Sequence, residues 1–343
     1  MLADLVASHP GPLVPGLEVR PPGGGDLEAV TRLYADAAAA RGGATPLRRE
    51  DLRVRWLMLG DPREAVLLTA PGGLAAYASA VVDLDPDTGE ATVHLDGQIH
   101  PDWTGRGLAG HLLAAATAAG EQALSETGTA AEDAGTGPGP TLRVRTALVD
   151  GDDHARTWFA RRGFRPVRHL LELHLDLHAP PPAPRWPAGF TVRGFEPGVD
   201  DEALWRTHQG AFADVPTHLP IARTDYLADR APDADPGLVW LVEHRTEPGD
   251  AEVVAVAVCR AGTEVAAGDG WVRDLGVLPA WRRRGVAMAL LRTTFAAFRD
   301  RGLTGVALEV DDVTLDGAVA LYRRAGMRVT RRTDVLERLS RPG

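Results

Sequence analysis

The chain has 343 residues, 44% of them hydrophobic and 24% charged, which is enough for two globular domains with cores of ordinary size. Its 37 basic residues are all arginine, and its 47 acidic residues leave a formal net charge of −10. This charge argues against nucleic-acid or acidic-membrane binding, because such affinity comes from neutralising phosphates. The single cysteine, Cys259, excludes an intrachain disulfide and a thiolate-rich metal site.

The beginning of the sequence lacks the basic segment and the long apolar run of a signal peptide. No stretch reaches the roughly 18 apolar residues that a membrane helix needs. We therefore expect a cytoplasmic protein without a membrane partner. Composition leaves the choice between a monomer and a homodimer open.

A proline-rich segment at 179–187 (APPPAPRWP) divides the chain into two parts that begin alike. Its run of prolines favours an extended linker over a helix or a strand. The sequences that start at Gly16 (GLEVRPPGGGD) and at Gly189 (GFTVRGFEPGVDD) both predict a short strand, a loop and an acidic helix start. We therefore predict an N-terminal domain at 1–178 and a C-terminal domain at 188–343, joined by this linker.

Two further segments are repeated between these parts. Residues 95–113 align without gaps on 273–291 (offset 178), and residues 154–164 align on 317–327 (offset 163). The offsets differ by 15 because a segment rich in Gly, Thr, Ala and Pro near 125–140 is present only in the first part. This segment has no helix or strand pattern and predicts an inserted loop. A repeat of this length indicates a domain duplication.

The second part shows a clear order of predicted elements. Apolar patterns predict strands at 237–243, 252–259, 271–277 and 305–310. A long helix is predicted at about 285–301, and a second helix at 315–325 ends before Gly326. Strands followed by a crossover helix and another strand predict an α/β fold with a partly parallel sheet.

The sequence AWRRRGVAMALL at 280–291 places Arg282, Arg283, Arg284 and Gly285 directly before an apolar helix. The first N–H groups of a helix have no internal acceptors, and glycine there lets an anion approach the backbone. The arginines add positive charge, so the segment predicts a phosphate-binding turn. It is neither a Walker loop nor a G-x-G-x-x-G dinucleotide site. An ordinary solvated helix start is the alternative.

These residues resemble the GNAT superfamily of N-acetyltransferases. Residues 282–287 (RRRGVA) match its acetyl-CoA signature [RQ]-x-x-G-x-[GA]. Residues 317–327 (GAVALYRRAGM) are similar to the late helix of the family, in which A-x-x-L-Y precedes a glycine. The resemblance covers most of 189–335 and, more weakly, 16–178. It implies two tandem GNAT-like domains, each a mixed, partly parallel twisted sheet flanked by helices.

The resemblance also implies a reaction and its residues. The reaction is transfer of an acetyl group from acetyl-CoA, a co-substrate, to a primary amine of a small molecule by direct attack and without a metal. The turn would hold the pyrophosphate, and Tyr322 would protonate the departing CoA thiolate. The implied cofactor-binding residues are Leu275, Gly276 and Val277, whose backbone would pair with the pantetheine arm, and Arg282, Arg283, Arg284, Gly285, Val286 and Ala287.

The first part carries a weaker copy of the signature at 104–109 (TGRGLA). Gly107 keeps the glycine of the turn, whereas Thr104 stands where the family has Arg or Gln. Phe159 aligns with Tyr322 and has no proton to donate. We therefore predict that the N-terminal domain is not catalytic.

The sequence leaves the general base and the acceptor open. Candidates for the base are the strand-end carboxylates Asp269, Asp274, Glu243 and Glu309. Candidates for acceptor contacts are His208 and His218. The HLDLH sequence at 174–178 has the residue types of a divalent metal site, but the polar face of a strand is the simpler interpretation.

Two alternative functions remain at this point. Tandem members of the GNAT superfamily include the mycothiol synthases, which acetylate a cysteinyl amine on a sugar-inositol thiol precursor. The other alternative is a non-catalytic acyl-CoA-binding sensor. A sensor would have no need of the hydroxyl of Tyr322, which therefore favours an enzyme.

Overall fold

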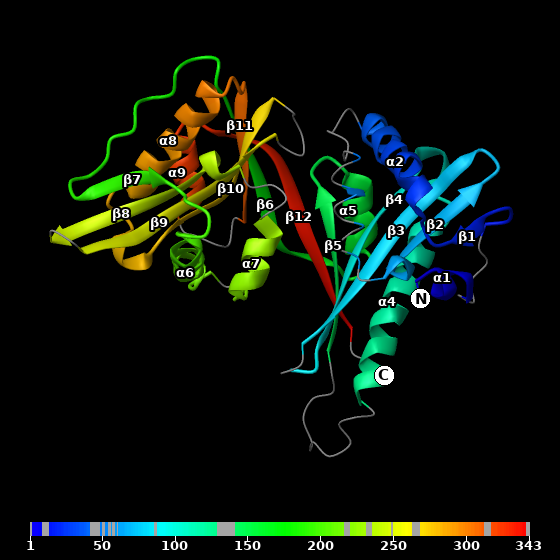
Figure 1. The fold of residues 1–343 in the computed structure, drawn as a ribbon. Helices are drawn as coiled ribbons and strands as arrows, with labels where there is room; N and C mark the ends of the chain where they lie inside the picture. Colours follow the sequence, from blue (N-terminus) through cyan, green and yellow to red (C-terminus); the bar gives the residue numbers. More distant parts are fainter. Residues whose placement is uncertain are drawn as a thin grey trace. The chain divides into compact units, whose positions relative to one another are not determined.

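The computed structural model describes residues 2–8, 14–41, 49, 52–53, 56, 59, 61–85, 88–128, 141–215, 220–230, 235–247, 250–262, 268–311 and 317–340. The chain forms two compact units (Figure 1). The first unit contains Met1–Arg168 and Thr333–Gly343, and the second contains His169–Arg332. The candidate His218 and most of the expected inserted loop, residues 129–140, lie outside the described residues.

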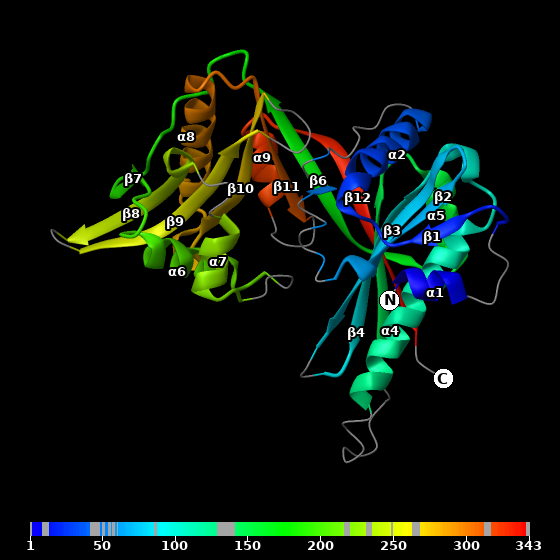
Figure 2. The ribbon, with the colours of Figure 1, turned by 45° about the vertical axis from the view of Figure 1, so that its right-hand side comes forward.

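The first unit is a sheet with helices on both faces (Figure 2). Its hydrogen-bonded strand order is β1 (Glu18–Arg20), β2 (Ala65–Ala70), β3 (Gly73–Leu84), β4 (Ala91–Ile99), β5 (Leu142–Val149) and the second half of β12 (Arg328–Ser340). Only β4 and β5 are parallel among these pairs. One face carries α1 (Leu2–Ser8), α4 (Leu108–Gly128) and α5 (Asp153–Ala160), and the other carries α2 (Leu27–Ala40).

The second unit has the same architecture. Its strand order is the first half of β12, β6 (Arg165–Asp176), β11 (Gly305–Asp311), β10 (Asp269–Val277), β9 (Asp250–Ala261), β8 (Val239–Glu247) and β7 (Phe190–Gly194). The β10–β11 pair is parallel, and β6–β11 and the pairs from β7 to β10 are antiparallel. One face packs against α8 (Val286–Asp300) and α9 (Ala318–Arg324), and the other against α6 (Asp201–Phe212) and α7 (Arg223–Arg230).

The strands and helices predicted for the second part are present. The four predicted strands correspond to β8, β9, β10 and β11, and the two predicted helices correspond to α8 and α9. In the first part, α4 continues to Gly128, so the start of the segment predicted as a loop is helical. The linker at 179–187 contains neither helix nor strand.

The compact units depart from the expected domain boundaries because the two parts of the chain exchange strands. The second half of β6, Leu170–Asp176, pairs with β11 of the second unit. The second half of β12, Thr333–Ser340, pairs with β5 of the first unit. Division of the chain at the linker would therefore open one strand edge in each unit. A strand pattern in a sequence shows which side chains are buried, but it does not identify the partner strand.

A bidentate ion pair at the start of α6 recurs at the start of α2. Arg193 Nη1 and Nη2 donate to the two carboxylate oxygens of Asp200 at 2.6 and 2.8 Å. Arg20 donates in the same way to Asp26 at 2.6 and 2.7 Å. The Arg193 guanidinium lowers the pKa of the Asp200 carboxyl, against the opposing effect of burial. Each pair fixes the helix that follows relative to the edge strand before it, which is β1 for α2 and β7 for α6.

Replacement of Asp200 by Asn is expected to destabilise the protein by about 2 kcal/mol at pH 7. This is below the usual cost of breaking a buried pair, because Arg193 is partly exposed and keeps Glu243 as a partner. The folded-state pKa of Asp200 is lowered, so its contribution is present above the unfolded pKa near 3.8 and is lost as the pH falls through the folded value. Urea unfolding at several pH values measures this difference.

The matched control is Glu202→Gln, which removes exposed ion pairs with Arg206, one turn later on α6, and with Arg223 on α7. We expect this variant to cost less than about 0.5 kcal/mol at pH 7. A stability difference between Asp200→Asn and the wild-type protein that stayed constant from pH 7 to pH 3 would contradict the role assigned to the carboxylate charge.

Candidate active site

The parallel strands β10 and β11 pair only at their start and then separate. Asp269–Trp271 pairs with Gly305–Ala307, after which β10 continues along β9 and β11 continues along β6. The edge of β10 that faces β11 therefore has no strand partner in the rest of its length, as far as the described residues show. Residues 275–277 lie on this edge, where an extended ligand can take the place of a strand. This is the position predicted for the pantetheine arm.

The turn between β10 and α8 has an unusual backbone. It contains the short helix η5 (Pro279–Trp281), then Arg283 with φ of 62° and Gly285, the N-cap of α8, with φ of 89°. Arg283 is the one non-glycine residue with positive φ in the described part of the chain. Turns of this kind direct successive backbone N–H groups towards one side and bind anions. The turn is exposed from Arg283 to Gly285, so a phosphate can reach it.

The corresponding turn of the first unit has the same backbone. Gly105 and Gly107 have φ of 74° and 86°, close to the values of the residues aligned with them in the second unit. The Arg106 guanidinium lies 4.6 Å from the centroid of the Trp103 ring, and the aligned pair in the second unit is 4.9 Å apart. The turn of the first unit therefore has the same backbone conformation as the turn of the second unit, but it carries fewer arginines.

Arg282, one of the predicted phosphate ligands, makes its contacts within the protein. Its guanidinium donates to the Asp214 carboxylate at 2.5 and 2.9 Å, to Ala211 O at 2.8 Å and to Val277 O at 3.0 Å. Arg282 therefore fastens the end of α6 to the start of the turn. This contact could not be predicted, because Asp214 lies 68 residues earlier. The exposed side chains of the turn are those of Arg283 and Arg284.

Tyr322 is buried at the end of α9. Its carbonyl accepts a hydrogen bond from Met327 N at 3.0 Å, and the Phe159 carbonyl accepts one from Phe164 N at 3.2 Å, so the two aromatic residues occupy equivalent positions. Burial and then the charge of Asp274 raise the pKa of the Tyr322 phenol to about 12. The phenol is therefore protonated at any physiological pH and has a proton to donate, which its counterpart Phe159 lacks.

The four carboxylates named as candidate bases lie in different surroundings. Asp269 is at the end of β10 away from the turn, with His174 Nε2 at 3.0 Å. Glu243 accepts a bond from an arginine of β7 at 2.5 Å, and Glu309 is exposed on β11. Asp274 lies near the turn end of β10, and its charge reaches Tyr322. Of the four carboxylates, Asp274 is the one whose charge contributes to the raised pKa of Tyr322.

The HLDLH segment contributes ion pairs. His174 contacts Asp269, and Asp176 accepts a hydrogen bond from Arg328 at 2.9 Å. Among the described residues, no group of three or more His, Cys, Asp or Glu side chains is placed to hold a metal ion. The two ion pairs agree with the interpretation of this segment as a polar strand face.

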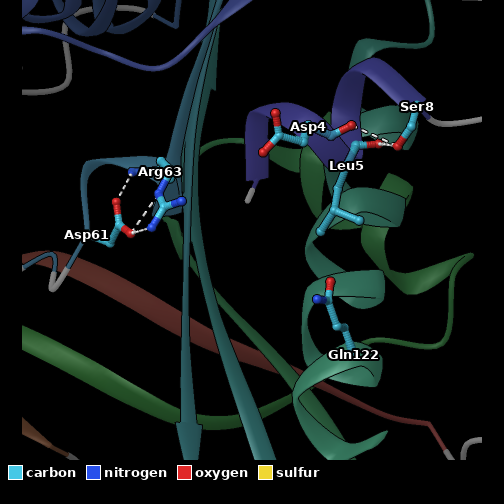
Figure 3. Close-up of a pocket in the computed structure, with 6 residues that line it drawn as sticks. All are labelled: Asp4, Leu5, Ser8, Asp61, Arg63 and Gln122. Carbon is cyan, nitrogen blue, oxygen red and sulfur yellow. Dashed lines mark hydrogen bonds and ion pairs between the residues drawn. The ribbon is translucent and has the colours of Figure 1, made fainter. Parts of the chain in front are cut away.

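A surface pocket of the first unit contains none of the candidate site residues (Figure 3). Its polar groups largely contact one another: Arg63 Nε donates to Asp61 Oδ2 at 2.8 Å, and Ser8 Oγ donates to Asp4 O at 2.7 Å. It is lined by Asp4, Leu5, Ser8, Asp61, Arg63 and Gln122.

Comparison with known proteins identifies the family. The sequence profile of the acetyltransferase (GNAT) family matches residues 202–327. A mycothiol acetyltransferase of Thermobispora bispora is 33% identical over 305 residues, which cover 88% of this chain and 92% of that relative. The chain belongs to the GNAT acetyltransferase family. The solved structure of a GCN5-related N-acetyltransferase from Sphaerobacter thermophilus aligns with this chain at a TM-score of 0.77 and 31% identity. The alignment covers 97% of this chain and 98% of the Sphaerobacter chain.

The tandem organisation of this GNAT protein also has a structural precedent. A tandem GNAT protein from the clavulanic acid biosynthesis pathway aligns at a TM-score of 0.63 and 15% identity, over 95% of this chain and 99% of that one. The predicted α/β tandem GNAT fold is confirmed. Family membership makes the chain an acyltransferase that uses an acyl-CoA, and the predicted transfer of an acetyl group to an amine is confirmed. The sensor alternative is not retained. None of the described helices combines the length and the apolar character needed to cross a membrane.

Proposed function

We propose that the second unit alone carries out acetyl transfer, from acetyl-CoA to a primary amine of a small molecule. The observation that carries the proposal is that three requirements meet only in this unit among the described residues. They are a strand edge left open by the separation of β10 and β11, an anion-binding turn with exposed arginines, and a phenol that stays protonated. The first unit shares the open strand edge and the turn, and it has Phe159 in place of the phenol.

In this proposal each part of the site has a defined task. The backbone of 275–277 binds the pantetheine arm as a strand would, and the N–H groups from Arg283 to Ala287 bind the pyrophosphate. The amine attacks the thioester carbonyl carbon, and backbone N–H groups of β10 stabilise the negative charge that develops on the oxygen. As the C–S bond breaks, Tyr322 donates its proton to the sulfur.

The relatives indicate a specific acceptor. The similar protein of Thermobispora bispora is named as a mycothiol acetyltransferase, and the alignment covers most of both chains. We therefore propose the cysteinyl amine of a sugar-inositol thiol precursor as the first acceptor to examine. Other small amines remain the broader proposal.

The test is to incubate the protein and acetyl-CoA with cysteinyl-glucosaminyl-inositol, free cysteine, glucosamine or spermidine, and to detect N-acetylated products by mass spectrometry. The S-methyl derivative of the cysteinyl acceptor separates amide formation from thioester formation. We expect an amide product with at least one acceptor and preferentially with the cysteinyl compound. Turnover of spermidine alone would overturn the proposed acceptor, and no amide product at all would overturn the proposed function.

A further inference from the structure

A β-bulge turns Asp274 towards α6. In the β9–β10 pairing, Val272 opposes Cys259 and Asp274 opposes Val258, so Arg273 is an extra residue. On a regular strand, side chains two residues apart lie on the same face of the sheet. Here Val272 packs against α8, whereas Val258, the cross-strand partner of Asp274, packs against α6 and α7. Asp274 therefore lies on the opposite face of the sheet from Val272. The pairing of β4 with β3 in the first unit has no such register shift.

Two glycines let α6 come close to this part of β10. A Cβ atom at Gly276 would lie 2.8 Å from the Ala211 Cβ, and one at Gly210 would lie 2.8 Å from the Leu278 Cδ2. A larger residue at Gly276 would push the helix away from the strand, whereas a larger residue at Gly210 would require the Leu278 side chain to move. The side chain of His208 on α6 is thereby brought to Asp274, with 3.5 Å between Nε2 and Oδ1.

A chain of hydrogen bonds fixes which nitrogen of His208 carries the proton. Ile221 N donates to Gln209 Oε1 at 3.1 Å, which assigns the amide orientation of Gln209. The Gln209 Nε2 amide then faces His208 Nδ1 at 3.2 Å and donates to it. His208 Nδ1 is therefore the acceptor, and Nε2–H points at the Asp274 carboxylate.

The exposure of the two side chains decides which of them can meet a substrate. The side chain of His208 is 6% exposed, and its ring lies 4.7 Å, centroid to centroid, from the rings of both Phe212 and Tyr226. The side chain of Asp274 is 17% exposed. The carboxylate is therefore the more accessible of the two groups to a substrate amine.

We infer that Asp274 is the general base of the acetyl transfer and that His208 is a positioning residue that holds its carboxylate. This inference rests on the proposed function of the second unit. It also replaces the expectation that His208 contacts the acceptor directly. The ionisable groups near the pair include the Cys259 thiol on β9, the Tyr226 phenol on α7 and the Tyr322 phenol on α9.

The proton balance of the reaction assigns one task to each group. Asp274 accepts a proton from the substrate ammonium, and the neutral amine forms the C–N bond. When the C–S bond breaks, Tyr322 gives its proton to the thiolate. The surplus proton on the new amide nitrogen then returns to the tyrosinate, and Asp274 releases its proton to water. The sum is an ammonium and a thioester converted to an amide, a thiol and one proton.

The charge of Asp274 also links proton uptake by Asp274 to proton donation by Tyr322. An ordinary thiol has a pKa of about 8.5, well below the value of about 12 for Tyr322, so proton transfer from the phenol to the thiolate is energetically uphill. Part of the raised pKa comes from the negative charge of Asp274, after the larger effect of burial. Once the carboxylate is protonated, this part disappears and Tyr322 becomes a stronger acid. Proton uptake by Asp274 therefore makes the later donation by Tyr322 less uphill.

The first unit contains an equivalent contact to a carboxylate, made by a tyrosine in place of the histidine, but it lacks a counterpart of the Tyr322 phenol. Asp96 aligns with Asp274 (offset 178), and Tyr34 lies eight residues after Asp26, as His208 does after Asp200. Tyr34 Oη donates to Asp96 Oδ2 at 3.1 Å. Asp96 therefore provides a control site with an equivalent contact and no expected part in catalysis.

The experiment compares Asp274→Asn with the wild-type protein in acetyl-CoA turnover of cysteinyl-glucosaminyl-inositol, or of whichever amine in the acceptor set reacts fastest, from pH 6 to pH 10. At pH 7 we expect kcat to fall about 100-fold with an unchanged Kd for acetyl-CoA. The loss should shrink at least about tenfold above the pKa of the acceptor amine, because a neutral amine needs no base. A loss that is constant across this range, or smaller than about threefold at pH 7, would overturn the inference.

Two variants of His208 test the positioning role separately. His208→Gln keeps an N–H donor near the carboxylate, and His208→Phe keeps the ring between its neighbours but removes the donor. We expect a loss of about tenfold in kcat for the Phe variant, recovered at high pH, and a loss of less than about threefold for the Gln variant. Equal losses in both variants would overturn the positioning role.

The remaining measurements separate this inference from the proposed function. Asp96→Asn should leave turnover unchanged, and a loss equal to that of Asp274→Asn would overturn the assignment to the second unit.

Tyrosinate absorbance after rapid pH jumps, with Tyr322→Phe to identify the signal, should show Tyr322 titrating at lower pH in Asp274→Asn. This readout needs no acceptor, so an unshifted titration overturns the link between the two groups even if the proposed function fails.

Discussion

Replacement of Tyr322 by Phe is expected to lower kcat about 100- to 1000-fold, the usual range for loss of a general acid. In the proposed mechanism the phenol gives its proton only as the C–S bond breaks, so the Kd for acetyl-CoA should stay within about threefold of the wild-type value. kcat and kcat/KM should fall by the same factor, because the lost interaction exists only in the transition state. Steady-state kinetics and calorimetry on the same preparation measure these quantities.

The chain provides a matched control for this variant. Phe159→Tyr places a hydroxyl at the equivalent position of the first unit, where the same backbone hydrogen bond follows the aromatic residue. We expect no change in turnover, because the proposed reaction takes place in the second unit, which this substitution does not alter. A Tyr322→Phe variant that kept more than a third of the wild-type kcat would show that the thiolate leaves without help from this phenol.

Replacement of Gly285 by Asp is expected to weaken acetyl-CoA binding about 100-fold relative to Gly285→Asn. Asn and Asp both tolerate the positive φ of this position, so the pair differs in charge and little in backbone strain. A carboxylate about 4 Å from a phosphate repels it by a few kcal/mol at an intermediate dielectric constant, which corresponds to this ratio. Calorimetry gives both the affinity and the stoichiometry.

The corresponding pair in the first unit is Gly107→Asp and Gly107→Asn. If the first unit only supports the structure, binding to the second unit is the same in both variants, and the stoichiometry is one throughout. A stoichiometry of two in the wild-type protein, reduced to one by Gly107→Asp, would show that the first turn also holds a cofactor. Equal affinities of Gly285→Asp and Gly285→Asn would contradict the assignment of the pyrophosphate to this turn.

The sequence predicted those parts of the site that depend on local pattern. The apolar strand before Arg282, the glycine at 285 and the long helix that follows were enough to locate the turn whose backbone has positive φ at Arg283 and Gly285. The alignment of Tyr322 with Phe159 was enough to distinguish the two halves. The general base could not be chosen from the sequence, because four carboxylates at strand ends are equivalent until their neighbours are known.

The sequence by itself determined the duplicated α/β fold, the location of the turn and the difference between the two halves. These properties follow from hydrophobic periodicity, glycine positions and the alignment of the chain with itself. The tertiary structure alone decided the rest: the exchange of β6 and β12, the use of Arg282 as a clamp on Asp214, and the orientation of Asp274 towards His208. The physical reason is that strand partners and ion-pair partners are distant in sequence, and that one extra residue, Arg273, reverses the face of every later side chain on β10.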